Sequence, residues 1–209
     1  MKFKIVSLFV LCAILISCGT SRQGGKKQRK GTKAQVVLTP EQQRKYDYFF
    51  LEASRLKMKD DYSAAFDLLQ HCLTINPNAS SALYEISQYY MYLKQVPQGQ
   101  AALEKAVEND PDNYWYSQGL ASLYQQQNEM QKATNLLESM ATRFSDRMDP
   151  LYSLLDIYNR LEEYDNVITT LNRLEEKMGK NEQLSMEKFR IYLQKKDNQS
   201  AFREIESLV

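Results

Sequence analysis

The sequence has little of the material from which most catalytic and metal sites are built. Its 209 residues include one histidine, three cysteines and seven glycines. It contains no glycine-rich phosphate loop, no nucleophile elbow and no cluster of residues with metal-ligand spacing. His71 has no second histidine with which to bind a metal, so we expect it to face solvent. We therefore predict that the chain is not an enzyme and holds no metal and no cofactor.

Acidic residues are absent from the first 34 positions, which carry eight basic side chains. The formal net charge of +1 hides this asymmetry, because the chain from Gln35 onward has 19 basic and 26 acidic side chains, a net charge of −7. A mildly acidic region of this size argues against general binding of nucleic acid. We predict no nucleic-acid partner.

The apolar run near the N-terminus is too short to span a bilayer as a helix. It extends from Ile5 to Ile16, follows a short basic start, and is followed by Ser17 and Cys18, as is typical of an export signal. The stretch Leu15-Ile16-Ser17-Cys18 resembles the lipobox of bacterial lipoproteins. This resemblance implies a signal peptide at 1–17 and acylation of Cys18. An uncleaved hydrophobic helix is the alternative.

The residues after Cys18 predict the location of the protein and the state of its thiols. Gly19 follows the cysteine instead of an aspartate. By analogy with sorting in Gram-negative bacteria, this favours the outer membrane, facing the periplasm. Since Cys12 leaves with the signal and Cys18 is acylated, Cys72 cannot form an internal disulfide. We expect it to be a small buried apolar residue.

Residues 18–38 are predicted to be a lipidated, basic and disordered tether. The segment has four glycines and six positive charges, and it has no large apolar residue before Val36. Such a composition cannot offset the entropy lost on ordering. The basic side chains are expected to be attracted to anionic headgroups, each by about 1 kcal/mol close to the surface. A solvated spacer without specific recognition is the alternative.

A period of 34 residues organises the chain from residue 39 to residue 209. Tyr90, Tyr124, Tyr158 and Tyr192 are each 34 residues apart. Two further series keep the same period, one of large apolar residues and one of small residues: Leu69, Leu103, Leu137, Leu171 and Ile205, and Ala65, Gly99, Ala133, Val167 and Ala201. A fixed period with the same chemistry at each phase predicts an array of supersecondary units that stack to bury their apolar faces.

Each unit resembles a tetratricopeptide repeat. The stretch from Tyr62 to Pro77 has the aromatic entry, small alanine, large apolar residue and closing proline of that family's second helix. The resemblance implies an all-α, right-handed α-solenoid of antiparallel helix pairs with about five units. We place repeat starts at Tyr46, Ser80, Tyr114, Met148 and Glu182, with an entry helix that begins after Thr39 and runs to about Met58. The last unit is incomplete.

The resemblance also implies a concave groove lined by first-helix residues, which would hold a protein or peptide. The positions that carry over are Phe50, Met58, Tyr84, Gln88, Met91, Tyr92, Trp115, Gln118, Gln125, Tyr152 and Asn159. Among these, Trp115, Tyr84 and Met91 are the preferred contact residues. An aromatic residue on a helix can equally be a packing residue.

These features together predict a lipid-anchored periplasmic scaffold for protein–protein interactions, in envelope assembly or secretion. Two alternatives stay open. The array could be the docking module of a longer enzyme with its catalytic domain beyond Val209, or a structural spacer between membrane and cell wall. Because the second helix of the last repeat is short and no polar capping helix follows, we expect either a continuing chain or a partner that covers this end.

Overall fold

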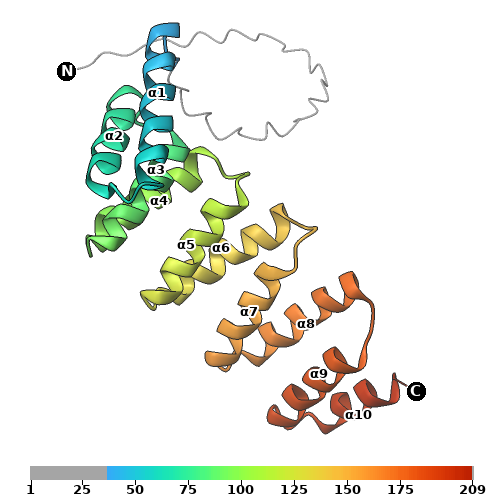
Figure 1. Cartoon of the computed structure of the whole chain (residues 1–209). Helices are drawn as coiled ribbons and strands as arrows, with labels where there is room; N and C mark the ends of the chain where they lie inside the picture. Colours follow the sequence, from blue (N-terminus) through green and yellow to red (C-terminus); the bar gives the residue numbers. More distant parts are fainter. Residues whose placement is uncertain (1–36, 209) are drawn as a thin grey trace, which may run out of the picture. The chain divides into compact units, whose positions relative to one another are not determined.

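The computed structural model describes residues 37–208. The predicted signal peptide at 1–17, the acylated Cys18 and nearly all of the predicted tether at 18–38 lie outside the described residues. Within the described part the chain forms ten α-helices and no strand (Figure 1). Their bounds are α1 Pro40–Lys57, α2 Tyr62–Ile75, α3 Ser80–Tyr92, α4 Val96–Asn109, α5 Tyr114–Gln126, α6 Met130–Arg143, α7 Asp149–Arg160, α8 Tyr164–Met178, α9 Glu182–Gln194 and α10 Asn198–Glu206.

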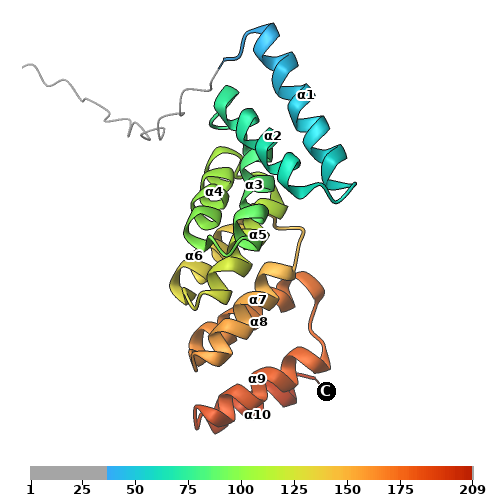
Figure 2. The same ribbon diagram turned by 60° about the vertical axis from the view of Figure 1, so that its left-hand side comes forward.

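The helices are arranged as five consecutive pairs. Each odd-numbered helix packs against the even-numbered helix that follows it, and each pair contacts the next pair along the chain (Figures 1 and 2). The predicted all-α solenoid of helix pairs is confirmed. Helices α3, α5 and α9 begin at Ser80, Tyr114 and Glu182, where the 34-residue frame places repeat starts.

Local sequence explains where several helices begin. Thr39 caps α1 by accepting a hydrogen bond from the Gln42 amide, while the Gln42 side chain accepts one from the Thr39 amide. Pro97 lies in the first turn of α4, where a missing N–H costs nothing. Helix α7 has Met148 at its N-cap position, and Asp149 is an acid in its first turn, where a negative charge interacts favourably with the helix dipole.

The small residues of the 34-residue period let paired helices approach closely. Ala65, Ala133, Val167 and Ala201 are fully buried. Gly99 shows the constraint most clearly, because a Cβ there would lie 2.7 Å from Met91 Sδ and 3.2 Å from the Ser87 carbonyl oxygen. A side chain at this position would force the Met91 side chain to move and the α3 backbone near Ser87 to give by a few tenths of an ångström.

Every turn within a helix pair contains one residue in the left-handed region. These residues are Asp60, Lys94, Asn128, Glu162 and Lys196, again 34 residues apart, with φ between 56° and 62°. The amide of the next residue donates to a carbonyl near the end of the first helix, as in Gln95 to Tyr90 and Glu129 to Tyr124, both at 2.8 Å. This closure satisfies helix carbonyls that would otherwise be unpaired.

The tyrosines of the period join successive pairs. The Tyr124 hydroxyl donates to Glu104 at 2.9 Å, and the Tyr158 hydroxyl donates to Glu138 at 3.3 Å. Each carboxylate belongs to the second helix of the preceding pair. Both tyrosines are buried, so each ring fills space between successive pairs while its hydroxyl reaches a polar group of the preceding pair.

Cys72 is buried and free, as predicted. Its thiol lies 3.8 Å from the Tyr46 carbonyl oxygen, to which it donates. Burial raises the pKa of the thiol to about 11, so it stays protonated at neutral pH. His71 beside it is exposed, as expected.

Candidate partner-binding face

The first helices of neighbouring pairs lie against one another and form one face. The Tyr46 hydroxyl on α1 lies 2.9 Å from Ser81 Oγ on α3, and Lys57 pairs with Glu85 at 2.7 Å across the same junction. From α3 to α5 the contact is aromatic, with ring centroids of Tyr84 and Tyr116 4.9 Å apart. The candidate face is therefore built by α1, α3 and α5, with α7 following in the next pair.

Three of the predicted groove residues are half-buried and already engaged in packing. Phe50 stacks on Tyr46 with centroids 5.9 Å apart, Tyr84 packs on Tyr116, and Met91 packs against Gly99. Tyr84 and Met91 were two of the three preferred contact residues. Their side chains instead hold neighbouring helices together, so replacing either one should destabilise the array.

A second group of predicted groove residues is exposed. It comprises Met58, Gln88, Tyr92, Trp115, Tyr152 and Asn159. Tyr92 on α3 is 81% exposed and Trp115 on α5 is 62% exposed, which is unusual for side chains of this size. Tyr152 on α7 is also exposed, with its hydroxyl 3.3 Å from Met178 Sδ.

Gln118 and Gln125, the remaining predicted residues, are half-buried on α5. The side-chain oxygen of Gln118 accepts a hydrogen bond from the Tyr114 hydroxyl at 3.0 Å. Gln118 therefore supports the aromatic cluster that ends in Trp115, since the Tyr114 and Trp115 rings meet edge to face at 5.3 Å.

Arg147 orders the surroundings of Trp115. Its guanidinium lies 4.0 Å from the Tyr114 ring centroid and 5.5 Å from that of Trp115. Such cation–π contacts contribute about 0.5–1 kcal/mol at exposed sites. Tyr114 is buried and packs edge to face on Phe144, so Trp115 projects from a rigid base. A rigid, exposed aromatic side chain loses little entropy when it binds.

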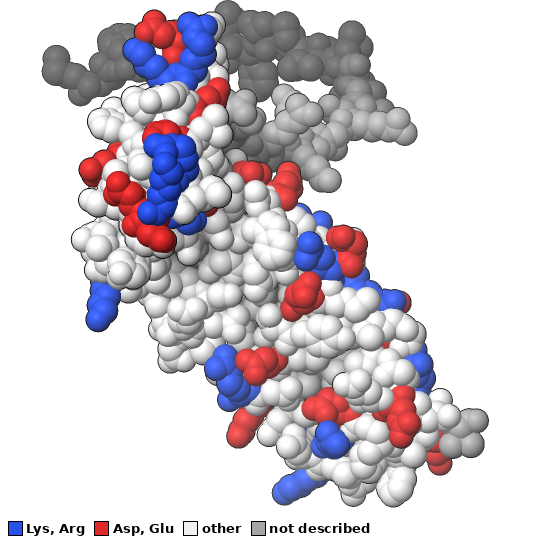
Figure 3. All heavy atoms as spheres, viewed as in Figure 1, with Lys and Arg blue, Asp and Glu red and all other residues white. Residues whose placement is uncertain are grey.

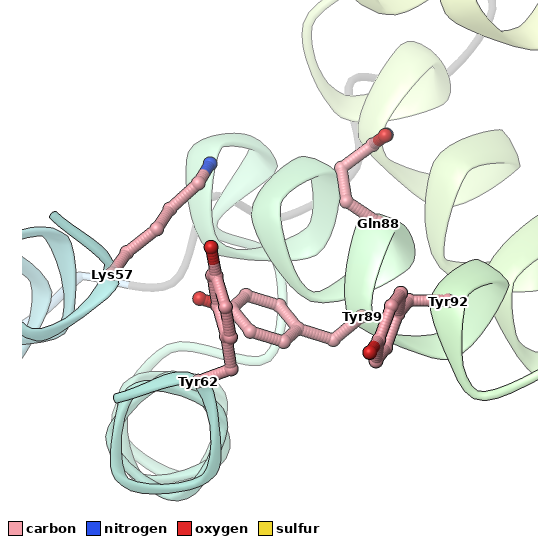
Figure 4. Close-up of a pocket in the computed structure, with 5 residues that line it drawn as sticks. All are labelled: Lys57, Tyr62, Gln88, Tyr89 and Tyr92. Carbon is pink, nitrogen blue, oxygen red and sulfur yellow. The ribbon is translucent and has the colours of Figure 1, made fainter. Parts of the chain in front are cut away.

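A pocket opens where α1, α2 and α3 meet (Figure 4). Its volume is about 430 Å³, and it is lined by Lys57, Tyr62, Gln88, Tyr89 and Tyr92. Gln88 and Tyr92 were predicted groove residues, whereas Lys57, Tyr62 and Tyr89 were missed. One feature of the sequence could have pointed to this pocket: Tyr62 is an aromatic residue directly after the turn acids Asp60 and Asp61.

Charge is sparse in the middle of the face shown in Figure 3, where uncharged side chains form a continuous area bordered by paired blue and red groups. Several charged side chains of the described residues are paired, such as Arg143 with Asp112 at 2.6 Å and Arg160 with Asp156 at 3.4 Å, which reduces their net charge. A weakly charged surface with exposed aromatics suits a polypeptide partner.

The described residues contain no group of three His, Cys, Asp or Glu side chains placed to hold a metal ion. In the same part of the chain, no helix combines the length and apolar character needed to cross a membrane.

Comparison with known proteins identifies the repeat. Residues 80–113, which span α3 and α4, match the family model described as Tetratricopeptide repeat. The comparison with curated proteins gave no match.

Solved structures share the fold. A crystal structure of MamA protein matches with a TM-score of 0.58 and 18% identity, covering 78% of this chain and 90% of that one. MamA from Desulfovibrio magneticus RS-1 matches with a TM-score of 0.54 and 13% identity, covering 78% and 92%. A tetratricopeptide repeat protein from Parabacteroides merdae ATCC 43184 matches with a TM-score of 0.52 and 16% identity, covering 79% of each chain.

Proposed function

We propose that the described array of helix pairs, of which residues 80–113 match the tetratricopeptide repeat, serves as a scaffold that binds a protein partner on the face built by α1, α3, α5 and α7. The fold itself implies a protein–protein interaction role in a groove. The observation that supports this particular face is that each of three successive first helices carries an exposed aromatic side chain: Tyr92, Trp115 and Tyr152.

These aromatics have the properties of interaction hot spots. Trp and Tyr are enriched among residues that dominate binding energy, because they bury a large rigid area and lose little side-chain entropy. Tyr114 and Arg147 contact the Trp115 ring, and Gln118 holds Tyr114 by a hydrogen bond. The position of Trp115 is therefore set before a partner binds. We assign to Trp115 the central contact of the scaffold.

We further propose that the scaffold is anchored by acylated Cys18 and its basic tether to the outer membrane, facing the periplasm, where envelope assembly or secretion would supply its partners. The support is the lipobox-like stretch that ends at Cys18 and the acid-free segment that follows. Two or more acyl chains hold a protein stably on a membrane without a spanning helix. Replacing Cys18 with Ala should move the full chain from the membrane fraction to the soluble fraction. Retention of the variant at the wild-type level would contradict the anchor.

The partner-binding role is tested by crosslinking in cells followed by identification of the captured proteins. Trp115→Ala should reduce capture of the specific partners at least tenfold, with little change in thermal stability, because the side chain is mostly exposed. Tyr48→Ala is the matched control, since Tyr48 is 65% exposed on α1 but lies outside the predicted groove set. Undiminished capture by Trp115→Ala would overturn the assignment of this face.

A further inference from the structure

The pocket between α1, α2 and α3 contains a buried hydroxyl that nothing in the described protein satisfies. Tyr89 is 8% exposed, and its hydroxyl oxygen has no hydrogen-bond partner among the described residues. Figure 4 shows the Tyr89 ring in the middle of the pocket, between the rings of Tyr62 and Tyr92. A buried polar group without a partner is destabilising, and such groups are rare in folded proteins.

The walls of this pocket are aromatic. The Tyr62 and Tyr89 ring centroids are 6.4 Å apart with the rings edge to face, and Phe66 packs behind Tyr89 at 5.9 Å. Tyr92 closes the other side with a ring that is free to adapt, since its side chain is largely exposed. These rings offer both faces and edges to an incoming aromatic side chain.

The polar groups of the pocket are mainly hydrogen-bond donors. The Lys57 ammonium carries three N–H bonds, of which Glu85 takes one at 2.7 Å. The Gln88 amide nitrogen donates to Ser87 Oγ at 3.2 Å and has a second N–H. Together with the Tyr89 hydroxyl, these groups favour a ligand that brings an acceptor oxygen.

The positive charge of Lys57 also selects against one class of ligand. Three tyrosines around a cavity could form a cage for a quaternary or protonated amine. A cation in this pocket would lie beside the Lys57 ammonium, which is part of the lining and has Glu85 as its one carboxylate partner among the described residues. An uncharged aromatic group with a neighbouring carbonyl oxygen fits the same walls without that repulsion.

We propose that this pocket is a specificity subsite for an aromatic side chain of the partner polypeptide, whose adjacent backbone carbonyl accepts a hydrogen bond from the Tyr89 hydroxyl. The volume of about 430 Å³ lies within the range of roughly 300–1,000 Å³ seen for ligand pockets. This proposal rests on the proposed partner-binding function. It requires the partner to place an aromatic side chain at the end of the face that is formed by α1 and α3.

The probe is N-acetylphenylalanine N-methylamide, and its binding to the full chain is followed by NMR through ¹³C-labelled tyrosine rings. The dissociation constant should rise at least fivefold in Tyr89→Phe and at least tenfold in Tyr92→Ala. It should be unchanged in Tyr48→Ala, which removes an exposed tyrosine elsewhere on α1. N-acetylalanine N-methylamide, which lacks the ring, should bind at least tenfold more weakly than the probe.

Tyr89→Phe separates a binding role from a structural one. Because the hydroxyl has no partner, removing it should leave the melting temperature unchanged or raise it. A clear loss of melting temperature would show that the hydroxyl is needed by the fold, and would overturn the proposal. Equal binding of the probe to Tyr89→Phe and wild type, or tighter binding of tetramethylammonium than of the probe, would also overturn it.

The probe-binding experiment and the Trp115→Ala capture experiment can fail independently of each other. Loss of partner capture in Trp115→Ala with no binding of the probe to the wild type would refute the subsite and keep the scaffold. Binding of the probe in the expected pattern, with undiminished capture by Trp115→Ala, would keep the pocket and refute the assignment of Trp115.

Discussion

The fourth and fifth repeats place different chemistry at the same structural position. Leu154 on α7 and Lys188 on α9 are one period apart, and both are buried, with exposed fractions of 0% and 3%. Ile86 and Leu120 occupy this position in the second and third repeats and are buried as well. The fifth repeat therefore holds a charged side chain where the three preceding repeats hold an apolar one.

Lys188 is tolerated because two carboxylates surround it. Its ammonium lies 2.8 Å from Glu175 on α8 and 2.9 Å from Glu204 on α10, so it links three helices. Burial opposes the charged form of Lys188, but the hydrogen bonds and the negative charges of both carboxylates together outweigh burial and raise the pKa of the ammonium. Equivalent helix pairs of the array can therefore be held by apolar burial or by a paired charge, and the stability of the two differs in its sensitivity to pH.

The largest effect is expected from giving the fourth repeat the charge of the fifth. Leu154→Lys removes a fully buried leucine and buries an ammonium without matched carboxylates, which should lower the free energy of unfolding by about 5 kcal/mol. Chemical denaturation and hydrogen exchange of the α7 amides would measure it. A loss below about 1 kcal/mol would mean that this core position accommodates charge without built partners.

A smaller loss is expected from removing the charge from the fifth repeat. Lys188→Met keeps much of the side-chain volume but leaves Glu175 and Glu204 facing each other, so we expect the α9 and α10 amides to lose about 2–3 kcal/mol of protection at neutral pH. Hydrogen exchange resolves this repeat by repeat. Lys195→Met, which breaks only the surface pair with Asp165, is the control and should change protection by about 0.5 kcal/mol or less.

The pH dependence of that loss follows from the two pKa shifts. Burial raises the pKa of Glu204, but the hydrogen bonds from Lys188 and Ser185 and the charges of Lys188 and Lys180 together outweigh burial and lower the pKa below the ordinary 4.5. Its contribution is therefore complete above that value and is lost as pH falls through the folded-state pKa. The pKa of Lys188 is raised above 10.5, so its contribution is lost only as pH rises through that higher value.

The stability difference between wild type and Lys188→Met should therefore be flat from roughly pH 6 to pH 9 and shrink on either side. Denaturation midpoints of both proteins across this range would check it. A difference that is constant down to pH 3 would show that the carboxylates do not stabilise the fifth repeat through their charge.

The smallest effect concerns the turns, where the fourth and fifth repeats should respond alike. Glu162 and Lys196 have φ of 56° and 61°, a conformation in which a Cβ is unfavourable. Glu162→Gly and Lys196→Gly should each stabilise the chain by about 0.5 kcal/mol, since relief of strain exceeds the added entropy of the unfolded chain. Denaturation midpoints measure both, and a loss in either variant would mean that its side chain contributes more than the strain costs.

The sequence predicted the array well because period and packing coincide. Ala65, Leu103, Leu137 and Tyr124 recur with the same chemistry, and each is buried where the period places it. Periodicity does not show which positions of a helix a neighbouring side chain will cover. The sequence alone therefore could not distinguish the packing residues Tyr84 and Met91 from the exposed Trp115. Lys188 could have been noticed in the sequence, since it shares a phase with Leu154, but its burial depends on carboxylates from two other helices.

The pocket around Tyr89 could not be predicted from the sequence either, because it depends on how the helices pack. Its lining comes from three helices, and the unpartnered hydroxyl is a property of the packed structure rather than of any motif. The signal peptide, the acylation of Cys18 and the membrane location remain predictions from the sequence.

Because the left-handed turn residue recurs in every helix pair, one 34-residue unit can be removed or added at this turn. Lys94 and Asn128 have φ of 58° and 60°, and each is followed by an amide that closes the same hydrogen-bonded turn. A deletion of residues 95–128 would join Lys94 directly to Glu129 with the backbone already in the required conformation. Units can thus be removed or duplicated at this point without a new linker, so the length of the scaffold, and the number of partner segments it spans, can change in steps of one repeat.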